Sequence, residues 1–215
     1  MRLLVAALFI TLVCISSAVP AKEQADDYKE IKQFQTRPIT QEILAQLRKG
    51  GYVLYMRHGN TDTSRPDAVK VDFNDCATQR MLSKEGRRVA AEIGNYIRKA
   101  NIPVGDIYAS PMCRTKETAL LAFGKQPNVN MLLRYTANMP DKVKFDALET
   151  IRELVSKPVQ GQTNRVIVAH SQNLMALFGY LPSPEGTVVI FKPLGNQQFN
   201  YIASIQPAQW ATILH

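Results

Sequence analysis

The chain has 215 residues, of which 46% are hydrophobic and 20% are charged, and 26 Lys and Arg outnumber 18 Asp and Glu. This apolar content can form one hydrophobic core, and it excludes a disordered, collagen-like or disulfide-dense protein. The formal net charge of +8 favours an anionic partner such as a phosphorylated molecule. The basic residues are scattered and accompany no nucleic-acid-binding motif, so the sequence predicts no nucleic-acid partner. A basic surface without a specific partner is the alternative.

The first residues have the pattern of a secretory signal peptide. Arg2 precedes an apolar run, and small residues follow as far as Ala21. The run is shorter than the roughly 20 residues that a transmembrane helix needs, so we expect cleavage after Ala21 (or Ala18) and no stable membrane anchor afterwards. An uncleaved anchor is the alternative. We therefore expect a periplasmic or secreted protein with a signal peptide at 1–21, a flexible lead-in at 22–38 and one domain at 39–215.

Helix and strand signals alternate along the domain. Thr40 can cap a short helix that ends at Gly50, and Ser83 can cap a longer helix that runs to about Ala100. Further helices are predicted from about 115, over 143–155 and from about 173, and buried strands over 52–56, 107–109, 166–169, 188–191 and 199–205. The alternation predicts the α/β class, with a three-layer α/β/α sandwich around a mainly parallel sheet in a single domain.

Polar residues follow three of the predicted strands. Arg57 and His58 follow the first, Ser110 and Arg114 follow the second, and His170 follows the third. Each of them alone is more often structural. Ligands bind beyond the carboxyl ends of the strands in such sheets, so we expect these side chains to surround one small volume. A guanidinium group pairs with phosphate oxygens and a neutral imidazole can attack phosphorus, so the set predicts a site for a phosphoryl group.

The motifs around these residues resemble those of the histidine phosphatase superfamily, which also contains the cofactor-dependent phosphoglycerate mutases. The resemblance covers nearly all of the mature chain and suggests an exported bacterial-type member. It rests on Arg57-His58-Gly59, Leu82-Ser83-x-x-Gly86, Ser110-Pro-x-x-Arg114 and an apolar strand that ends at His170.

The resemblance implies a phosphomonoesterase that forms a phosphohistidine and needs no cofactor. His58 would be the nucleophile, and Arg57, Arg114 and His170 would hold the phosphoryl oxygens. Asn60 would add a hydrogen bond. The sequence has no His pair or Asp cluster at metal-binding spacing, so we expect no metal.

The substrate implied by the resemblance is a small phosphomonoester. Exported members of the superfamily act on phosphorylated sugars of the lipopolysaccharide core, which makes an envelope phospho-sugar the candidate. Arg65, Lys70 and Arg80 lie on the long loop after His58, and we expect Arg80 to bind an anionic substrate. A phosphate-binding protein without turnover and a phosphomutase are the alternatives, and the oligomeric state stays open.

The residue that protonates the leaving oxygen is not identified by the sequence. One branch of the family has Asp directly after the second His, where this chain has Ser171, and another has Glu downstream of the second Arg. The candidate acids, each of which could equally be a surface carboxylate, are Glu149 and Glu185, followed by Glu153, Asp62 and Asp75.

Two cysteines remain after the expected cleavage. Cys76 lies on the long loop, and Cys113 directly precedes Arg114. An oxidising compartment allows them to pair, so we predict a disulfide that ties the loop to the site. Two buried free thiols are the alternative.

Overall fold

One six-stranded sheet lies at the centre of the protein, whose computed structural model describes residues 34–137 and 139–214. Its strand order is β3-β2-β4-β1-β5-β6. Neighbours from β3 to β1 are parallel, and β5 and β6 are antiparallel, so the predicted α/β fold is confirmed with a mixed sheet. The strands are β1 (Val53–Arg57), β2 (Val104–Ala109), β3 (Asn128–Val129), β4 (Asn164–Ala169), β5 (Val188–Gly195) and β6 (Gln198–Ile205).

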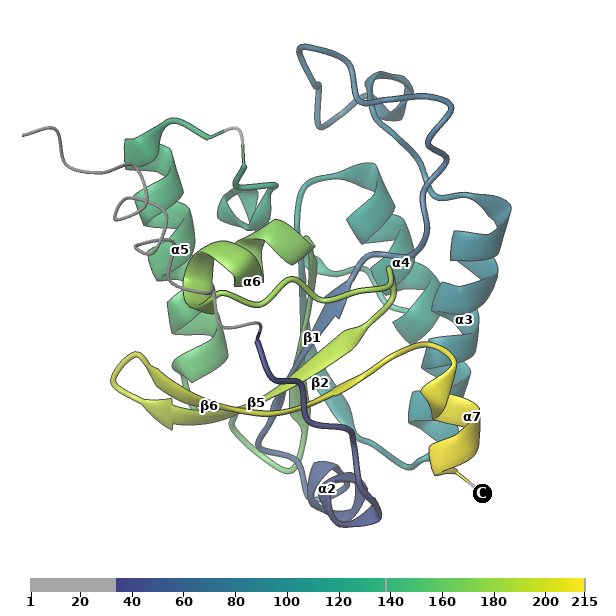
Figure 1. Cartoon of the computed structure of the whole chain (residues 1–215), viewed down its shortest axis with the longest axis vertical. Helices are drawn as coiled ribbons and strands as arrows, with labels where there is room; N and C mark the ends of the chain where they lie inside the picture. Colours follow the sequence, from purple (N-terminus) through teal and green to yellow (C-terminus); the bar gives the residue numbers. More distant parts are fainter. Residues whose placement is uncertain (1–33, 138, 215) are drawn as a thin grey trace, which may run out of the picture. The chain divides into compact units, whose positions relative to one another are not determined.

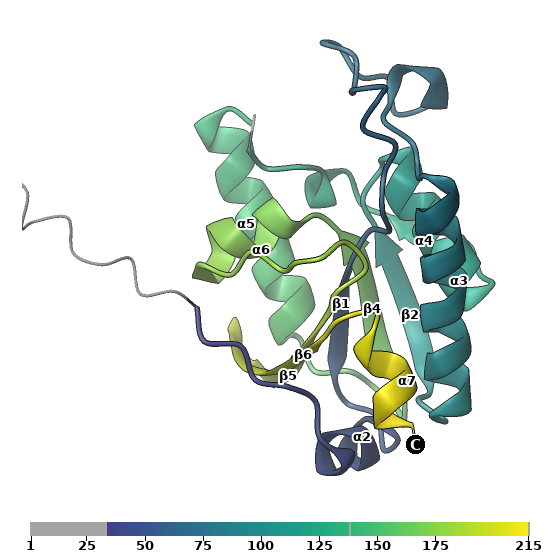
Figure 2. The same cartoon turned by 45° about the vertical axis from the view of Figure 1, so that its right-hand side comes forward.

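Helices cover both faces of the sheet, as Figure 1 and Figure 2 show. Successive side chains of a strand point to opposite faces, so β1 supplies Leu54 and Met56 to one core and Val53 and Tyr55 to the other. The two cores confirm the three-layer architecture. On the first face lie α2 (Gln41–Leu47), α3 (Lys84–Lys99), α4 (Cys113–Phe123) and α7 (Gln209–Ile213), and on the second lie α5 (Asp141–Ser156) and α6 (Ser171–Phe178).

The capping signals place the helix beginnings well. Thr40 and Ser83 are the N-caps of α2 and α3, and the side chain of Ser83 accepts a hydrogen bond from the Gly86 amide at 3.0 Å. Helices α4 and α6 start at Cys113 and Ser171, each two residues earlier than predicted. Helix α6 therefore begins one residue after the end of β4, and α4 begins three residues after the end of β2. The short elements β3 and α7 were not predicted, because two and five residues are too few for a periodic pattern.

The last five residues of the predicted lead-in at 22–38 lie within the described residues and contact the domain. The ring of Phe34 stacks on Tyr180, with the ring centroids 4.5 Å apart, and Pro38 forms a bridge to Ser204. Aromatic burial thus fixes a stretch whose polar composition suggested flexibility. The predicted signal peptide and residues 22–33 lie outside the described residues. Within the part that the structure describes, every helix is too short or too polar to cross a membrane.

Candidate active site

Three adjacent strands end at the same edge of the sheet. Arg57 at the end of β1 pairs with Ala169 at the end of β4, and Ala109 at the end of β2 pairs with Val168 of β4. The next residues continue this register, because the His58 amide donates to the Ala169 carbonyl at 3.1 Å. The strand order therefore gathers the predicted polar residues around the end of β4.

His58 is buried and its ring has a fixed orientation. Its Nδ1 lies 2.9 Å from the Gly59 carbonyl oxygen. A carbonyl oxygen can only accept, so Nδ1 carries the proton and Nε2 keeps a free lone pair. The Gly59 amide in turn donates to Thr118 Oγ1 at 3.1 Å, which holds the turn against α4. The second imidazole, His170, lies with its ring centroid 5.3 Å from that of His58.

Both imidazoles are held in the neutral form. Burial lowers the pKa of His58 to about 3, and the nearby charges of Arg114, Arg57 and Arg80 act in the same direction. Burial also lowers the pKa of His170 well below its usual value, and His58 and the same arginines contribute. A neutral imidazole keeps the lone pair that nucleophilic attack requires.

The ring of His170 is positioned from two sides. Its Nε2 lies 2.9 Å from Ser110 Oγ, and its backbone carbonyl accepts from the Tyr55 hydroxyl at 2.8 Å. Within the described residues, its buried Nδ1 has no hydrogen-bond partner. The same holds for the buried Nε atoms of Arg57 and Arg114. Unpaired buried N–H groups such as those of Arg57 and Arg114 are the donors that a bound oxyanion needs.

The turn after His58 packs against the start of α3 at a distance that only glycine allows. A Cβ atom on Gly86 would lie 2.0 Å from the Asn60 carbonyl oxygen. The same oxygen accepts from the Ser83 amide at 2.9 Å. The Leu82-Ser83-x-x-Gly86 motif therefore supports the turn that follows His58, and Asn60, predicted to add a hydrogen bond to the substrate, lies in that turn.

The arginines approach the imidazoles from different elements. Arg57 Nη1 donates to the Pro182 carbonyl at 3.0 Å, and its Nη2 lies 3.4 Å from Glu185 Oε1. Arg114, in the first turn of α4, has a side chain that is 2% exposed. Arg80 is half-buried, and its charge acts on both histidines and on Arg57 and Arg114. The structure thus brings three cations to the two imidazoles.

The structure separates the two leading candidate acids. Glu185 belongs to the cluster, because its Oε1 lies 3.4 Å from Arg57 Nη2 and 3.9 Å from His58 Nδ1, and Thr61 donates to both of its oxygens. Glu149 does not, because its carboxylate accepts from Gln197 at 3.2 Å in the β5–β6 turn. That turn is at the far end of β5, about 25 Å from the strand ends at roughly 3.3 Å per residue. The amphipathic helix exposes Glu149, and the prediction of an acid there is wrong.

The other candidate acids have local roles. Asp62 accepts from the amide and hydroxyl of Ser64, and Asp75 accepts from the Ala77 amide as the cap of a short 3-10 helix. Sequence reasoning missed Asp67. Its Oδ1 lies 2.9 Å from Arg114 Nη1 and accepts from the Arg80 amide at 2.7 Å. Only its place between Arg65 and Arg80 on the long loop could have drawn attention to it.

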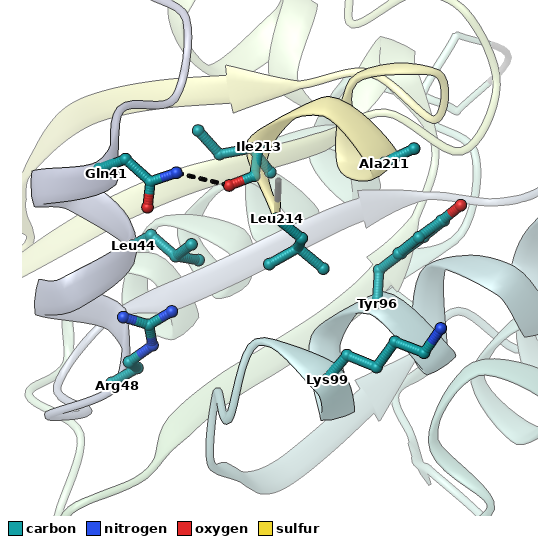
Figure 3. A pocket seen from close by; sticks show the side chains of 8 residues that line it. All are labelled: Gln41, Leu44, Arg48, Tyr96, Lys99, Ala211, Ile213 and Leu214. Carbon is teal, nitrogen blue, oxygen red and sulfur yellow. Dashed lines mark hydrogen bonds between the residues drawn. The ribbon is translucent and has the colours of Figure 1, made fainter.

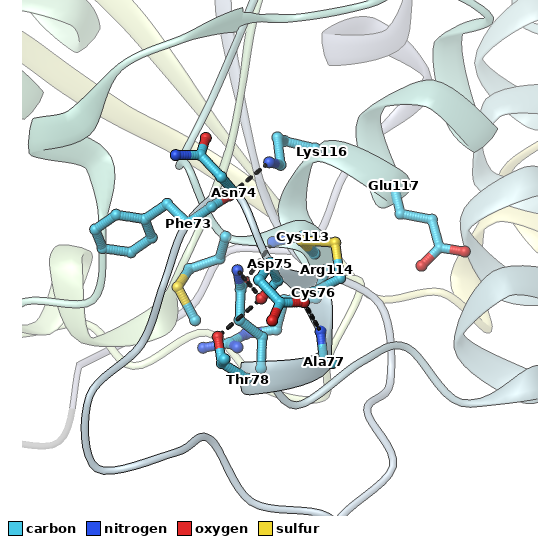
Figure 4. Close-up of a disulfide and its surroundings, with 12 residues drawn as sticks. Phe73, Asn74, Asp75, Cys76, Ala77, Thr78, Cys113, Arg114, Lys116 and Glu117 are labelled. Atoms are coloured by element: carbon cyan, nitrogen blue, oxygen red, sulfur yellow. Dashed lines mark hydrogen bonds between the residues drawn. A yellow bond between two sulfur atoms is a disulfide. The ribbon is translucent and has the colours of Figure 1, made fainter.

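The loop over the site, residues 61–80, is fastened to the first turn of α4. Cys76 and Cys113 form the predicted disulfide, with an S–S distance of 2.07 Å (Figure 4). Gln79 Oε1 accepts from the Cys113 amide at 2.7 Å, and Lys116 Nζ donates to the Phe73 carbonyl at 3.3 Å. The loop and the phosphate ligand Arg114 predicted from the sequence are therefore held together.

Two cavities lie outside the cluster of imidazoles. One of about 410 Å³ lies beside the 61–80 loop, and Arg65, Gln79 and Arg87 contribute to its lining. The other, of about 390 Å³, lies between α2, α3 and α7, where Figure 3 shows Arg48 and Lys99. That second cavity is at the amino ends of the strands, so it is remote from the predicted site residues.

Comparison with known proteins gives a family match for part of the chain and a fold for most of it. Residues 53–134 match the model of the histidine phosphatase superfamily (branch 1). The protein histidine phosphatase SixA in complex with tungstate is similar at 15% identity, with a TM-score of 0.52, over 74% of this chain and 98% of that one. YhfR of Bacillus stearothermophilus is similar at 19% identity, with a TM-score of 0.52, over 71% of this chain and 95% of that one. The mycobacterial glucosyl-3-phosphoglycerate phosphatase in complex with VO3 is similar at 17% identity, with a TM-score of 0.50, over 72% of this chain and 98% of that one. No curated protein matches the chain.

The fold is therefore that of the similar solved structures, among them SixA. The segment that matches the histidine phosphatase superfamily model, residues 53–134, contains Arg57, His58 and Arg114 of the strand-end cluster, as the resemblance of the motifs predicts.

Proposed function

We propose that the protein is a metal-independent phosphomonoesterase that acts through a phosphohistidine at His58 on an extracytoplasmic substrate. The observation that carries the proposal is the state of His58. It is a buried neutral imidazole whose Nδ1 donates to Gly59, so that Nε2 is free to attack. The guanidinium groups of half-buried Arg57 and buried Arg114 lie close enough to act on its charge.

The proposed reaction has two displacements. His58 Nε2 forms a bond to phosphorus while the bond to the ester oxygen breaks, and the electron pair leaves with that oxygen. Arg57, Arg114 and His170 hold the phosphoryl oxygens and stabilise the charge in the transition state. A water molecule then attacks phosphorus, the phosphorus–nitrogen bond breaks, and inorganic phosphate leaves.

An envelope phospho-sugar is the substrate that we propose. The predicted signal peptide and the net charge of +8 support an anionic substrate outside the cytoplasm. Two of the structural relatives are phosphatases with bound tungstate or VO3, which supports a site for a tetrahedral oxyanion. Arg65 and Arg80 lie on the loop beside the site and supply further positive charge for such a substrate.

The test is hydrolysis of an aryl phosphate by the wild type and by His58→Ala. We expect the variant to lose activity by a factor of at least about 10³ with an unchanged melting temperature, because the nucleophile is removed. We also expect a wild-type phosphoenzyme that is labile in acid and stable in alkali, and activity that survives EDTA. Retention of most activity by His58→Ala, or its loss with EDTA, would contradict the proposal.

A panel of phosphomonoesters distinguishes the alternatives. A phosphatase releases inorganic phosphate from at least one ester, whereas a phosphomutase transfers the phosphoryl group to another hydroxyl. A phosphate-binding protein without turnover binds inorganic phosphate or vanadate and releases nothing from any ester.

A further inference from the structure

Two carboxylates lie at the cluster of imidazoles and arginines within the described residues, and they approach it from different directions. Glu185 contacts Arg57 and His58, whereas Asp67 contacts Arg114 and the backbone of Arg80. Departure of an alkoxide from phosphorus needs a proton donor, because an unprotonated alkoxide is a poor leaving group. The position of each carboxylate relative to the attacking nitrogen indicates which one can protonate the leaving oxygen.

Glu185 lies beside the nitrogen of His58 that does not attack. Its Oε1 is 3.9 Å from Nδ1, the nitrogen that is bonded to the Gly59 carbonyl. In an in-line displacement the leaving oxygen lies on the opposite side of phosphorus from the attacking Nε2. A carboxylate next to Nδ1 is therefore behind the nucleophile. Its contacts suit a role in orienting Arg57, with which it pairs at 3.4 Å.

Asp67 approaches the cluster from the solvent side. Its side chain is 31% exposed, whereas that of Arg114, to which it is joined at 2.9 Å, is 2% exposed. The carboxylate thus lies between a buried guanidinium group and the solvent, from which a substrate must come. Its second oxygen, Oδ2, is not used by the contacts to Arg114 and Arg80, which both involve Oδ1.

The backbone on both sides of Asp67 is fixed. The Ala68 amide donates to the Thr78 carbonyl at 2.8 Å, and the Arg80 amide donates to Asp67 itself. The disulfide of Cys76 and Cys113 joins the same loop to the residue that precedes Arg114. A group that transfers a proton needs such a fixed distance to the reacting atoms.

We propose that Asp67 is the catalytic residue that protonates the leaving oxygen, a role that rests on the function proposed above. When the phosphoryl group binds Arg114, that guanidinium pairs with phosphate oxygens in place of Asp67. The carboxyl group, in its protonated form, then lies beside the bound phosphoryl group. As His58 Nε2 bonds to phosphorus and the ester bond breaks, the electron pair on the leaving oxygen takes the proton of Asp67. In the second displacement the Asp67 carboxylate takes a proton from the attacking water, which restores the starting state.

The experiment measures kcat/KM of Asp67→Asn for alkyl phosphates and for p-nitrophenyl phosphate, because this ratio reports on the step that breaks the ester bond. An alkoxide needs the proton and p-nitrophenolate does not. We expect a loss of about 10²- to 10³-fold for the alkyl esters and less than about 10-fold for the aryl ester. Asp72→Asn is the matched control on the same loop, since Asp72 contacts the Asn74 amide, and it should behave as the wild type.

Three outcomes would overturn the proposal. An equal loss on both substrates would mean that Asp67 only positions Arg114. A gain in activity with tighter vanadate binding would mean that the carboxylate blocks the site. A leaving-group-dependent loss in Glu185→Gln and not in Asp67→Asn would assign the proton to Glu185. Trapping of the wild-type phosphohistidine is the separate readout: its absence would contradict the proposed function, whereas its presence with any of these outcomes would contradict only the role of Asp67.

Discussion

The floor of the candidate site, formed by His58, Ser110 and His170, and the 61–80 loop over it are held by different kinds of contact. The floor residues are at most 4% exposed, and backbone hydrogen bonds continue the register of the sheet into them. The loop is largely exposed, with Val69 fully so, and it is held by a disulfide and a few side-chain contacts. The floor therefore suits chemistry that needs fixed geometry, and the loop suits selection of substrates, which varies at low cost to the fold.

Among changes at the junction of floor and loop, the largest effect should follow from removing Arg114, the cation that joins them. We expect Arg114→Ala to lower kcat/KM for an aryl phosphate by about 10²- to 10³-fold, because a buried guanidinium that stabilises phosphoryl charge is lost. Arg114→Lys should recover only part of the activity, since Lys lacks the planar fork. Arg152→Ala, which removes an exposed guanidinium on α5, is the control and should leave the activity unchanged. A similar loss in both Ala variants would contradict the assignment.

Removing the disulfide between Cys76 and Cys113 tests whether the 61–80 loop can become more mobile while the floor residues keep their geometry. On the chain-entropy argument, a Cys76→Ser and Cys113→Ser double variant should lose roughly 3–4 kcal/mol of unfolding free energy. For an aryl phosphate, whose leaving group does not need the proton of Asp67, we expect a raised KM and a nearly unchanged kcat, because the loop contacts Arg114 while His58 is held by the sheet. Urea unfolding and steady-state kinetics measure the two effects. A fall in kcat with no change in KM would show that the loop fixes the floor.

The buried histidines should make the floor sensitive to acid. In the unfolded chain a histidine takes up a proton below about pH 6.5, whereas folded His58 stays neutral to about pH 3. The unfolded state then binds more protons, so stability should fall as the pH drops from 6.5 towards 3, by about 1.4 kcal/mol per pH unit for this residue. Thermal unfolding of the wild type and of His58→Asn between pH 6.5 and pH 3 measures this loss of stability. If the melting temperatures of the two proteins fell in parallel with pH, the buried imidazole of His58 would not be the cause.

The smallest effect is expected at Arg80 on the loop. Its charge acts on the floor residues, and we expect it to bind an additional anionic group of the substrate. Arg80→Ala should weaken the binding of multiply charged esters by about 10-fold and of simple esters by less than about 3-fold, as expected for a partly screened charge. Inhibition constants for mono- and bisphosphates measure this difference. Equal effects on both would remove Arg80 from substrate selection.

The floor could be predicted from the sequence and much of the loop could not. His58, Arg114 and His170 each follow a short apolar strand or begin a helix, so a local pattern places them at one sheet edge. The position of Asp67 depends on contacts with Thr78, Arg80 and Arg114, which exist only once the chain has folded. Glu149 shows the converse. Its downstream position fitted a family pattern, but the geometry of α5 directs it to the β5–β6 turn.

The contact between Gly86 and the Asn60 carbonyl has a consequence for the tolerance of the chain to substitution. Gly86 touches no reacting atom, yet even a methyl group there must push the turn that holds His58 away from α3. A library of single substitutions scored for activity would therefore place Gly86 among the least permissive positions, beside the nucleophile itself. Substitutions that are harmless on the exposed face of α3 would therefore be eliminated at this buried position, 28 residues along the sequence from His58.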